Sequence, residues 1–225
     1  MNRPGSEPVQ FFKGMKYLVV ALFTLALGVC FTFVAFWIVK KQSQSLKPDE
    51  GLSVLGENLG TPTGLIRIPV PVYLQKDPKW GSKQLGPSSD TIAGYGCTLC
   101  SMAMALGSQG FEIAPDELNN RLMAHQGFTE NSLLIWGAIE KVTSGQFTVE
   151  IQNSPDHDLI DGELAKGNPL IAKVLYDNRI YHWVLVTGKD DSGYLIADPL
   201  GSGSAHGSMA DYPSGICAVR YLKKP

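Results

Sequence analysis

Cys97 is the residue of this chain whose type and position most directly suggest chemistry. It follows a glycine-punctuated stretch, residues 94–96, and opens a run of small and apolar residues that continues to about Leu106. This pattern predicts a helix that begins at the cysteine. Unpaired N–H groups at the start of a helix favour a thiolate over a thiol, and a thiolate is a strong nucleophile. The position therefore suits covalent catalysis.

Two residues of the C-terminal third are candidates for a base and for the group that orients it. His182 lies in the strand-like run 181–187, and Asp198 ends a second run, 194–198. If the intervening hairpin is symmetric about Asp190, His182 lies directly opposite Asp198, and the carboxylate accepts the imidazole N–H. A slip of one residue would move Asp198 to the other face of the sheet. The pairing therefore depends on one assumed register.

Gln75 is a candidate donor for the negative charge that develops on a carbonyl oxygen during acyl transfer. Its side-chain amide and the backbone N–H of Cys97 would together serve as an oxyanion hole. Each residue alone also has an ordinary interpretation. Glutamine is mostly a surface residue, His182 suits a buried strand, and Asp198 before Pro199 suits a turn. The combination favours the catalytic interpretation.

The spacing of Cys97 and Cys100 has a second interpretation, a thiol–disulfide redox site, in which a disulfide would remove the nucleophile. A redox motif of this kind is expected directly after a strand in a βαβ unit, whereas a polar segment, residues 88–91, precedes Cys97. A zinc site would need a second nearby pair of ligands. We interpret Cys100 as a small buried residue and expect no cofactor and no metal.

The pattern of residues from position 65 onward predicts helices first and a sheet afterwards. Pro69 and Pro71 allow only an edge strand or an extended entry over residues 66–73. Helical patterns cover 97–106, 115–127, 131–141 and 158–166, and strand patterns cover 148–151, 169–176, 181–187, 194–198 and 217–222. This order predicts an α+β domain with an antiparallel sheet.

The first 64 residues predict a membrane anchor and a tether. The uncharged apolar run 17–39 is long enough to cross a hydrocarbon core of ~30 Å. A signal peptide is the alternative, but no small-residue cleavage site follows the run. We therefore expect an N-terminal tail at 1–16, a transmembrane helix at 17–39, a flexible linker at 40–64 and a folded domain at 65–225.

Charge and cysteine content exclude some classes of protein. The formal net charge is −2, and no block of lysine and arginine follows the anchor, so we expect no nucleic-acid partner. Three of the four cysteines, Cys97, Cys100 and Cys217, lie in the folded domain. An odd number leaves at least one thiol free or paired between chains, and is unlike a disulfide framework.

At this point the chain resembles a known family. The segments 71–80, 91–97 and 101–106, followed by 182–188 and 197–199, are similar to the C-39-like peptidases. These are papain-like cysteine peptidases related to the bacteriocin-processing peptidases that cut after double-glycine leaders. The resemblance implies a papain-like fold of N-terminal helices packed on an antiparallel sheet, and a peptide or protein substrate.

The same resemblance implies a role for each candidate residue. Cys97 would be the nucleophile, His182 the base, Asp198 the orienting residue and Gln75 part of the oxyanion hole. One departure is that Thr-Leu-Cys follows Cys97 where many relatives have Gly-Pro or a similar run.

Together these features predict a single-pass, membrane-anchored cysteine peptidase or related amide hydrolase. The family resemblance further favours a domain outside the cytoplasm, because the flanking positive charges do not decide the orientation. The alternatives are a catalytically silent peptide-binding domain of the same fold, a Cys-x-x-Cys redox protein and a cell-wall amidase.

Overall fold

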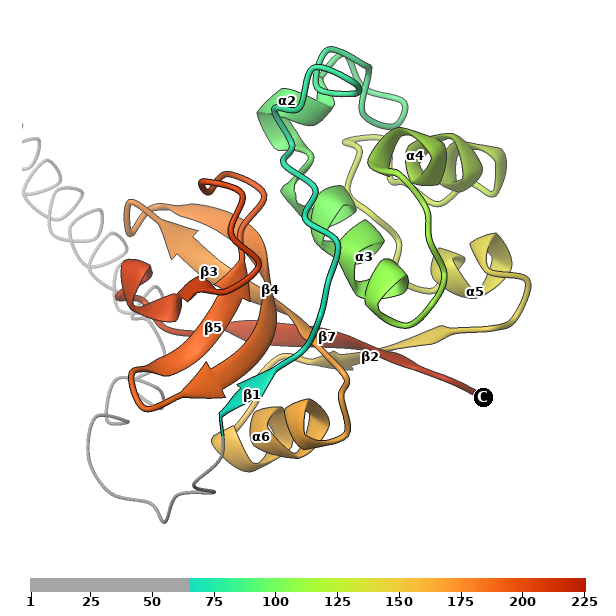
Figure 1. The fold of residues 1–225 in the computed structure, drawn as a ribbon. Coiled ribbons are helices and arrows are strands. Elements are labelled where there is room, and N and C mark those ends of the chain that lie inside the picture. Colours follow the sequence, from blue (N-terminus) through green and yellow to red (C-terminus); the bar gives the residue numbers. More distant parts are fainter. Residues whose placement is uncertain (1–64) are drawn as a thin grey trace, which may run out of the picture. The chain divides into compact units, whose positions relative to one another are not determined.

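The computed structural model describes residues 65–225, and within them an antiparallel sheet packs with helices (Figure 1). The strands of this seven-stranded sheet lie in the order β2-β7-β3-β4-β5-β6, and β1 pairs with β4. The strands are β1 (Ile66–Arg67), β2 (Thr148–Gln152), β3 (Leu170–Tyr176), β4 (Ile180–Asp190), β5 (Gly193–Ala197), β6 (Gly207–Ser208) and β7 (Ala218–Lys223). The helices are α2 (Ile92–Tyr95), α3 (Cys97–Ser108), α4 (Pro115–Ala124), α5 (Ala138–Val142), α6 (His157–Ala165) and the 3-10 helix η1 (Met209–Asp211). The predicted α+β class is confirmed.

Side-chain alternation along the strands divides the core between the two faces of the sheet. Leu185 and Ala197 face the cluster formed with α3, α4 and α5, which Figure 1 shows grouped together beside the sheet. Val184 and Val186 face a second cluster that contains residues of α6 and the segment around η1. Successive side chains of a strand point to opposite faces, so neighbouring residues of β4 belong to different clusters.

Helix α3 begins at Cys97, as the glycine-punctuated approach predicts, but it extends past its expected end near Leu106. Of the two glycines expected to end it, Gly107 lies inside the helix, whereas Gly110, with a φ of 89°, follows directly after the C-cap Gln109. A Cβ atom at Gly107 would lie only 2.6 Å from the ring of Pro71. Glycine at this position therefore allows the entry segment to cross the helix closely, and does not mark a helix end.

The predicted helix over residues 131–141 is wrong in its first half, since only α5 forms. Ser132 has a φ of 56°, which breaks a helical path. Its buried hydroxyl donates to the Leu85 carbonyl at 2.7 Å and accepts from the Ser88 N–H at 3.0 Å. These tertiary hydrogen bonds fix an irregular loop that sequence periodicity does not reveal.

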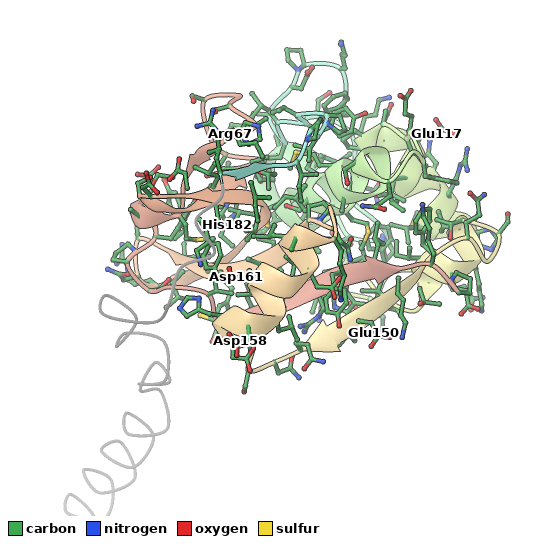
Figure 2. All side chains as sticks on the ribbon, turned by 60° about the horizontal axis from the view of Figure 1, so that its bottom comes forward. Arg67, Glu117, Glu150, Asp158, Asp161 and His182 are labelled. Atoms are coloured by element: carbon green, nitrogen blue, oxygen red, sulfur yellow. The ribbon has the colours of Figure 1, made fainter. Side chains whose placement is uncertain are left out.

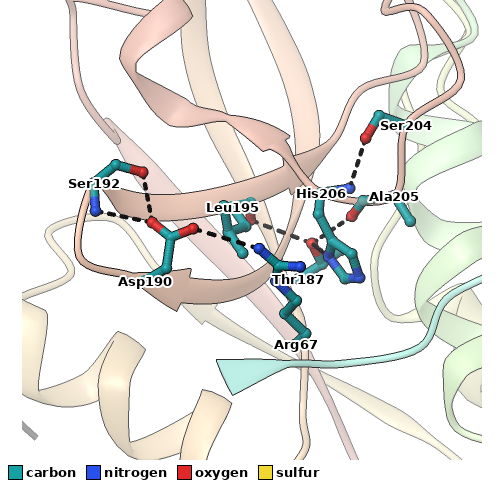
Figure 3. A network of polar contacts seen from close by, with 8 residues as sticks. All are labelled: Arg67, Thr187, Asp190, Ser192, Leu195, Ser204, Ala205 and His206. Carbon is teal, nitrogen blue, oxygen red and sulfur yellow. Dashed lines mark hydrogen bonds and ion pairs between the residues drawn. The ribbon is translucent and has the colours of Figure 1, made fainter. Parts of the chain in front are cut away.

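The β4–β5 hairpin also differs from the symmetric hairpin centred on Asp190. Its turn consists of only two residues, because Asp190 pairs with Gly193. The Asp190 carboxylate accepts hydrogen bonds from the N–H and hydroxyl of Ser192, and Arg67 forms an ion pair with it at 3.8 Å (Figure 3). The directly opposed pairing of His182 with Asp198 is therefore wrong, although the two side chains do meet, as described below.

A β-bulge at Thr187 interrupts the same hairpin. The extra residue is fully buried, and its hydroxyl donates to the Ala205 carbonyl at 2.7 Å (Figure 3). The following residue has to be glycine, since a Cβ at Gly188 would lie 2.0 Å from the carbonyl oxygen of Ile66 in β1. The bulge is thus fixed from both sides, by the loop before β6 and by β1.

The predicted N-terminal tail, transmembrane helix at 17–39 and linker lie outside the described residues. Among residues 65–225, none of the helices has the length and apolar character needed to cross a bilayer.

Candidate active site

The start of α3 lies against an open stretch of the β4 edge. Strand β5 ends at Ala197, opposite Leu185, so it does not pair with the preceding residues of β4. The backbone of Trp183 is satisfied there by α3 instead. The Ser101 hydroxyl donates to the Trp183 carbonyl at 3.1 Å, and the Trp183 backbone N–H helps to lower the pKa of the Cys97 thiol. The bond from Ser101 ties α3 to β4 next to His182.

His182 contacts both other candidate residues of the predicted triad. It is only 3% exposed, and its Nε2 lies 2.7 Å from Oδ1 of Asp198. Figure 2 labels His182 among the side chains of the domain. The imidazole also lies beside the Cys97 sulfur, close enough to lower the pKa of that thiol. Since Nε2 faces the carboxylate, Nδ1 is the nitrogen left for the sulfur.

The Thr187 bulge explains how Asp198 reaches this histidine. Beyond the bulge, Gly188 pairs with Leu195. If Thr187 and the residues before it simply continued this register, Asp198 would lie opposite Leu185, on the face of the sheet away from His182. Before the bulge the register changes by one residue, which places Asp198 opposite Val184. His182 lies two residues from Val184, on the same face, and so meets Asp198 as a diagonal neighbour.

Asp198 receives three hydrogen bonds, and one of them comes from a residue that the sequence analysis missed. Besides His182, the Leu200 N–H donates to Oδ1 at 2.8 Å and the Tyr212 hydroxyl donates to Oδ2 at 2.5 Å. The Tyr212 ring also lies beside the imidazole, with centroids 5.9 Å apart, and Tyr176 contacts it edge-on at 6.2 Å. No motif marks Tyr212, which directly follows η1 in a segment without periodicity.

Gln75 is buried, at 2% exposed, and lines the same cleft as Cys97. Its Nε2 donates to the Ala93 carbonyl at 2.8 Å, while its Oε1 has no hydrogen-bond partner among the described residues. The Gln75 backbone N–H donates to the Pro199 carbonyl at 3.0 Å. The glutamine is thus tied both to the approach to α3 and to the loop that follows Asp198.

The electrostatics of the three residues favour charge separation. Burial raises the pKa of the Cys97 thiol, but the hydrogen bond and positive charge of His182 and the Trp183 N–H outweigh it, so this pKa lies below its ordinary value. Burial lowers the pKa of His182, but its hydrogen bonds with Asp198 and Cys97 raise it to about 9. The arrangement therefore favours a thiolate beside an imidazolium at neutral pH.

The sulfur and the imidazole open into a cleft of about 720 Å³. One side of the cleft is lined by the loop around Leu133, and another by residues at the turned end of the β3–β4 hairpin. A thiolate exposed to such a cleft can attack an electrophilic carbon of a bound molecule, with the imidazolium available as a proton donor.

Cys100 is a different kind of thiol. It is fully buried, and burial raises its pKa well above the ordinary value. Cys97, Cys100 and Cys217 are all free thiols in the structure. Within residues 65–225, no group of His, Cys, Asp and Glu side chains is arranged to hold a metal ion.

A helix-borne thiol, an imidazole and a carboxylate that meet beside a cleft define a site of the kind used by papain-like cysteine hydrolases. The chain belongs to the Peptidase_C39 like family, whose model matches residues 67–222. Among solved structures it is similar to a proposed C39-like peptidase from Bacillus anthracis, with 14% sequence identity and a TM-score of 0.46. That match covers 72% of this chain and 98% of the other. A comparison with curated proteins found no match.

Proposed function

We propose that this protein is a cysteine peptidase, or a related amide hydrolase, with Cys97 as its nucleophile. The observation that carries the proposal is that the Cys97 sulfur, the His182 imidazole and the Asp198 carboxylate lie together, with Nε2 of His182 hydrogen-bonded to Asp198 and with Cys97 and His182 lining one cleft. Family membership supports the same class of chemistry.

In the first half of the reaction, the Cys97 thiolate attacks the carbonyl carbon of an amide. The sulfur–carbon bond forms as the carbonyl π electrons move to oxygen, and the tetrahedral intermediate collapses when His182 gives its proton to the leaving nitrogen. A thioester remains on Cys97. In the second half, His182 takes a proton from water, the hydroxide attacks the thioester, and the carboxylic acid leaves as the thiolate is restored.

The negative charge on the carbonyl oxygen requires donors that are already in place. Cys97 is the first residue of α3, so its backbone N–H lacks an intrahelical acceptor. The Gln75 Nε2 carries two N–H groups, and Ala93 accepts from one of them. We assign the second N–H of Gln75 and the N–H of Cys97 to the oxyanion hole.

The proposal is tested by comparing two substitutions on one helix. The full chain, with Cys97→Ala or with Cys100→Ala, is incubated with a mixture of unlabelled peptides, and new termini are identified by mass spectrometry. Cys97→Ala should abolish cleavage, whereas Cys100→Ala should retain it, because the buried thiol of Cys100 takes no part in the reaction. Cleavage that survives in Cys97→Ala would refute the proposal.

A peptide-binding domain without catalysis gives the opposite result. In that case neither the wild-type chain nor Cys100→Ala would produce new termini, although peptides would still bind. The redox alternative likewise predicts no new termini from the wild-type chain, because thiol–disulfide exchange cleaves no amide bond. The high pKa and full burial of Cys100 disfavour thiol–disulfide exchange.

We further propose that residues 17–39 anchor the domain to a membrane, with the domain outside the cytoplasm. The uncharged apolar run and its flanking lysines support the anchor, and the family resemblance favours the orientation. The full chain should remain with membranes after alkaline carbonate extraction, and protease added to intact cells should remove the domain. Release of the chain by carbonate would contradict the anchor, and protection from the protease would contradict the orientation.

A further inference from the structure

The cleft that contains Cys97 gathers much of the apolar surface that the domain exposes. Among the described residues, five of the nine exposed large hydrophobic side chains line this one cleft. They are Tyr95, Leu133, Tyr176, Ile180 and Tyr181. Isolated apolar residues are common on protein surfaces, but a group of them around one cavity marks a binding site.

One wall of the cleft is a loop that holds its apolar side chain in place. Leu133 is 66% exposed, yet its backbone is fixed by a hydrogen bond from its N–H to the Thr129 hydroxyl at 3.1 Å and by one from the Thr129 N–H to its carbonyl at 2.9 Å. The neighbouring Ser132 connects the loop to the Leu85 carbonyl. The backbone that carries the exposed Leu133 side chain is therefore ordered before a ligand binds, which reduces the conformational entropy lost on binding.

A second part of the lining comes from the turned end of the β3–β4 hairpin. Tyr176 and Ile180 are paired residues at its tip. The Tyr181 ring, 60% exposed, is covered on one face by the ammonium of Lys173, 4.1 Å from the ring centroid. Tyr176 contacts the His182 ring. This part of the lining therefore connects the apolar surface directly to the reacting groups.

Charge contributes little to selection in this cleft. Apart from His182, its charged lining residues are one cation, Lys76, and one anion, Asp90. The hydroxyl of Ser88 lies within hydrogen-bond distance of the Asp90 carboxylate. A cleft with balanced charge and apolar walls favours apolar side chains, since charged ones would lose hydration without gaining a partner.

From these features we infer that the cleft selects peptides with large aliphatic or aromatic side chains next to the bond that Cys97 attacks. This inference rests on the proposed function and specifies its substrate class. The Leu133 loop and the β3–β4 hairpin contact these side chains from two sides, and the scissile carbonyl lies between them at the sulfur. Acidic and basic side chains at the same positions are disfavoured.

The test uses irreversible peptide probes with the full chain. Short peptidyl vinyl sulfones that carry Leu or Phe beside the electrophile are compared with those that carry Asp or Lys, and the rate of labelling at Cys97 is followed by mass spectrometry. We expect the apolar probes to react about tenfold faster or more. Leu133→Asp should remove most of this preference, whereas Ile151→Asp, which alters an exposed apolar residue of β2 outside the cleft, should leave it intact.

Iodoacetamide separates failure of this inference from failure of the proposed function. It carries no peptide side chain, so its rate with Cys97 reports only the thiol. Suppose that iodoacetamide reacts faster at Cys97 than at an ordinary thiol, but the charged probes label Cys97 as fast as the apolar probes or faster. This result would overturn the inferred substrate preference and leave the proposed function standing. No enhanced reaction with iodoacetamide would count against the proposed function itself. If Leu133→Asp does not fold, Tyr181→Ser tests the part of the lining that the hairpin supplies, and an unchanged preference in a folded variant would overturn the inference.

Discussion

The two halves of the candidate site are built in different ways. The thiol half consists of Cys97 at the start of α3, where the chain direction and the helix end together place the sulfur. The imidazole half consists of His182 and Asp198 on the β4–β5 hairpin, where a bulge and a short turn decide which side chains meet. The position of the thiol depends on residues that are neighbours in sequence, whereas the contact between the imidazole and the carboxylate depends on strand register.

This difference determines where each half is vulnerable. A helix start tolerates changes elsewhere in the protein, because its capping groups are local. A sheet register does not, since a shift of one residue moves every later side chain to the other face. The thiol half should therefore fail mainly through its own residues, and the imidazole half also through residues outside the site.

The largest effect is expected from removing the imidazole itself. His182→Ala takes away the proton donor and the charge that stabilises the thiolate, so kcat/KM for peptide hydrolysis should fall by about 10³-fold or more. His125→Ala, at an exposed position after α4, is the matched control and should leave kcat/KM unchanged. Retention of activity in His182→Ala would mean that the two halves are not coupled.

Deleting Ala197 tests the sheet half without substituting a candidate catalytic residue. The deletion moves Asp198 from its place opposite Val184 to a place opposite Leu185, on the face of the sheet away from His182. We expect kcat/KM to fall by about 100-fold, as far as it does in Asp198→Ala. Thr187→Val keeps every residue of both strands and removes only the hydrogen bonds of the hydroxyl. It should therefore retain most activity.

Circular dichroism and the thermal midpoint show whether each hairpin variant folds. A folded Ala197 deletion variant with wild-type activity would show that the strand register does not position Asp198. An inactive and folded Thr187→Val would instead show that the hydroxyl, and not the residue count, controls the register.

The comparison also explains how far the sequence alone could predict the site. Cys97, His182, Asp198 and Gln75 are the residues named from the sequence, and all four lie at one site in the structure. The helix start at Cys97 follows from local glycine and small-residue signals. The direct opposition of His182 and Asp198 was wrong, because a bulge and a two-residue turn leave no periodic signal.

Tertiary contacts explain the remaining errors. The helix expected over 131–141 gave way to a loop fixed by the Ser132 hydroxyl, which bonds to a segment far away in sequence. Tyr212 was missed for a similar reason, since only the fold brings it to Asp198. Hydrogen bonds of this kind join residues that no spacing rule connects.

The pH dependence of thiol reactivity tests the charge separation between the halves. An ordinary thiol has a pKa near 8.5, so its alkylation rate falls about tenfold for each pH unit below that value. The pKa of Cys97 is lowered by His182, so its thiolate persists as the pH falls. Between about pH 8 and pH 6, iodoacetamide should lose less than about tenfold in rate at Cys97.

The alkylation rate should depend more steeply on pH when the imidazole is absent. In His182→Ala the thiol loses its cationic partner, its pKa rises, and the alkylation rate should fall steeply over the same range. In the wild type, peptide hydrolysis should also decline above about pH 9, where the imidazolium loses its proton. Equal slopes in the two proteins would show that no ion pair forms.

The smallest effect is expected at Tyr212, which acts through Asp198. Tyr212→Phe removes the hydrogen bond to Oδ2 but keeps the ring beside His182. One such bond contributes about 1 kcal/mol, so kcat should fall by about fivefold. KM should be unchanged, because Tyr212 is not among the residues that line the cleft.

Tyr194 provides the matched control for this substitution. Its hydroxyl donates to the Asp161 carboxylate at 2.9 Å, so Tyr194→Phe removes the same type of hydrogen bond at a position away from the cleft. If tyrosine–carboxylate bonds only stabilise the fold, both variants should lower the thermal midpoint and neither should change kcat. A fall in kcat confined to Tyr212→Phe would instead assign this tyrosine to the positioning of Asp198, as the third hydrogen bond on that carboxylate predicts.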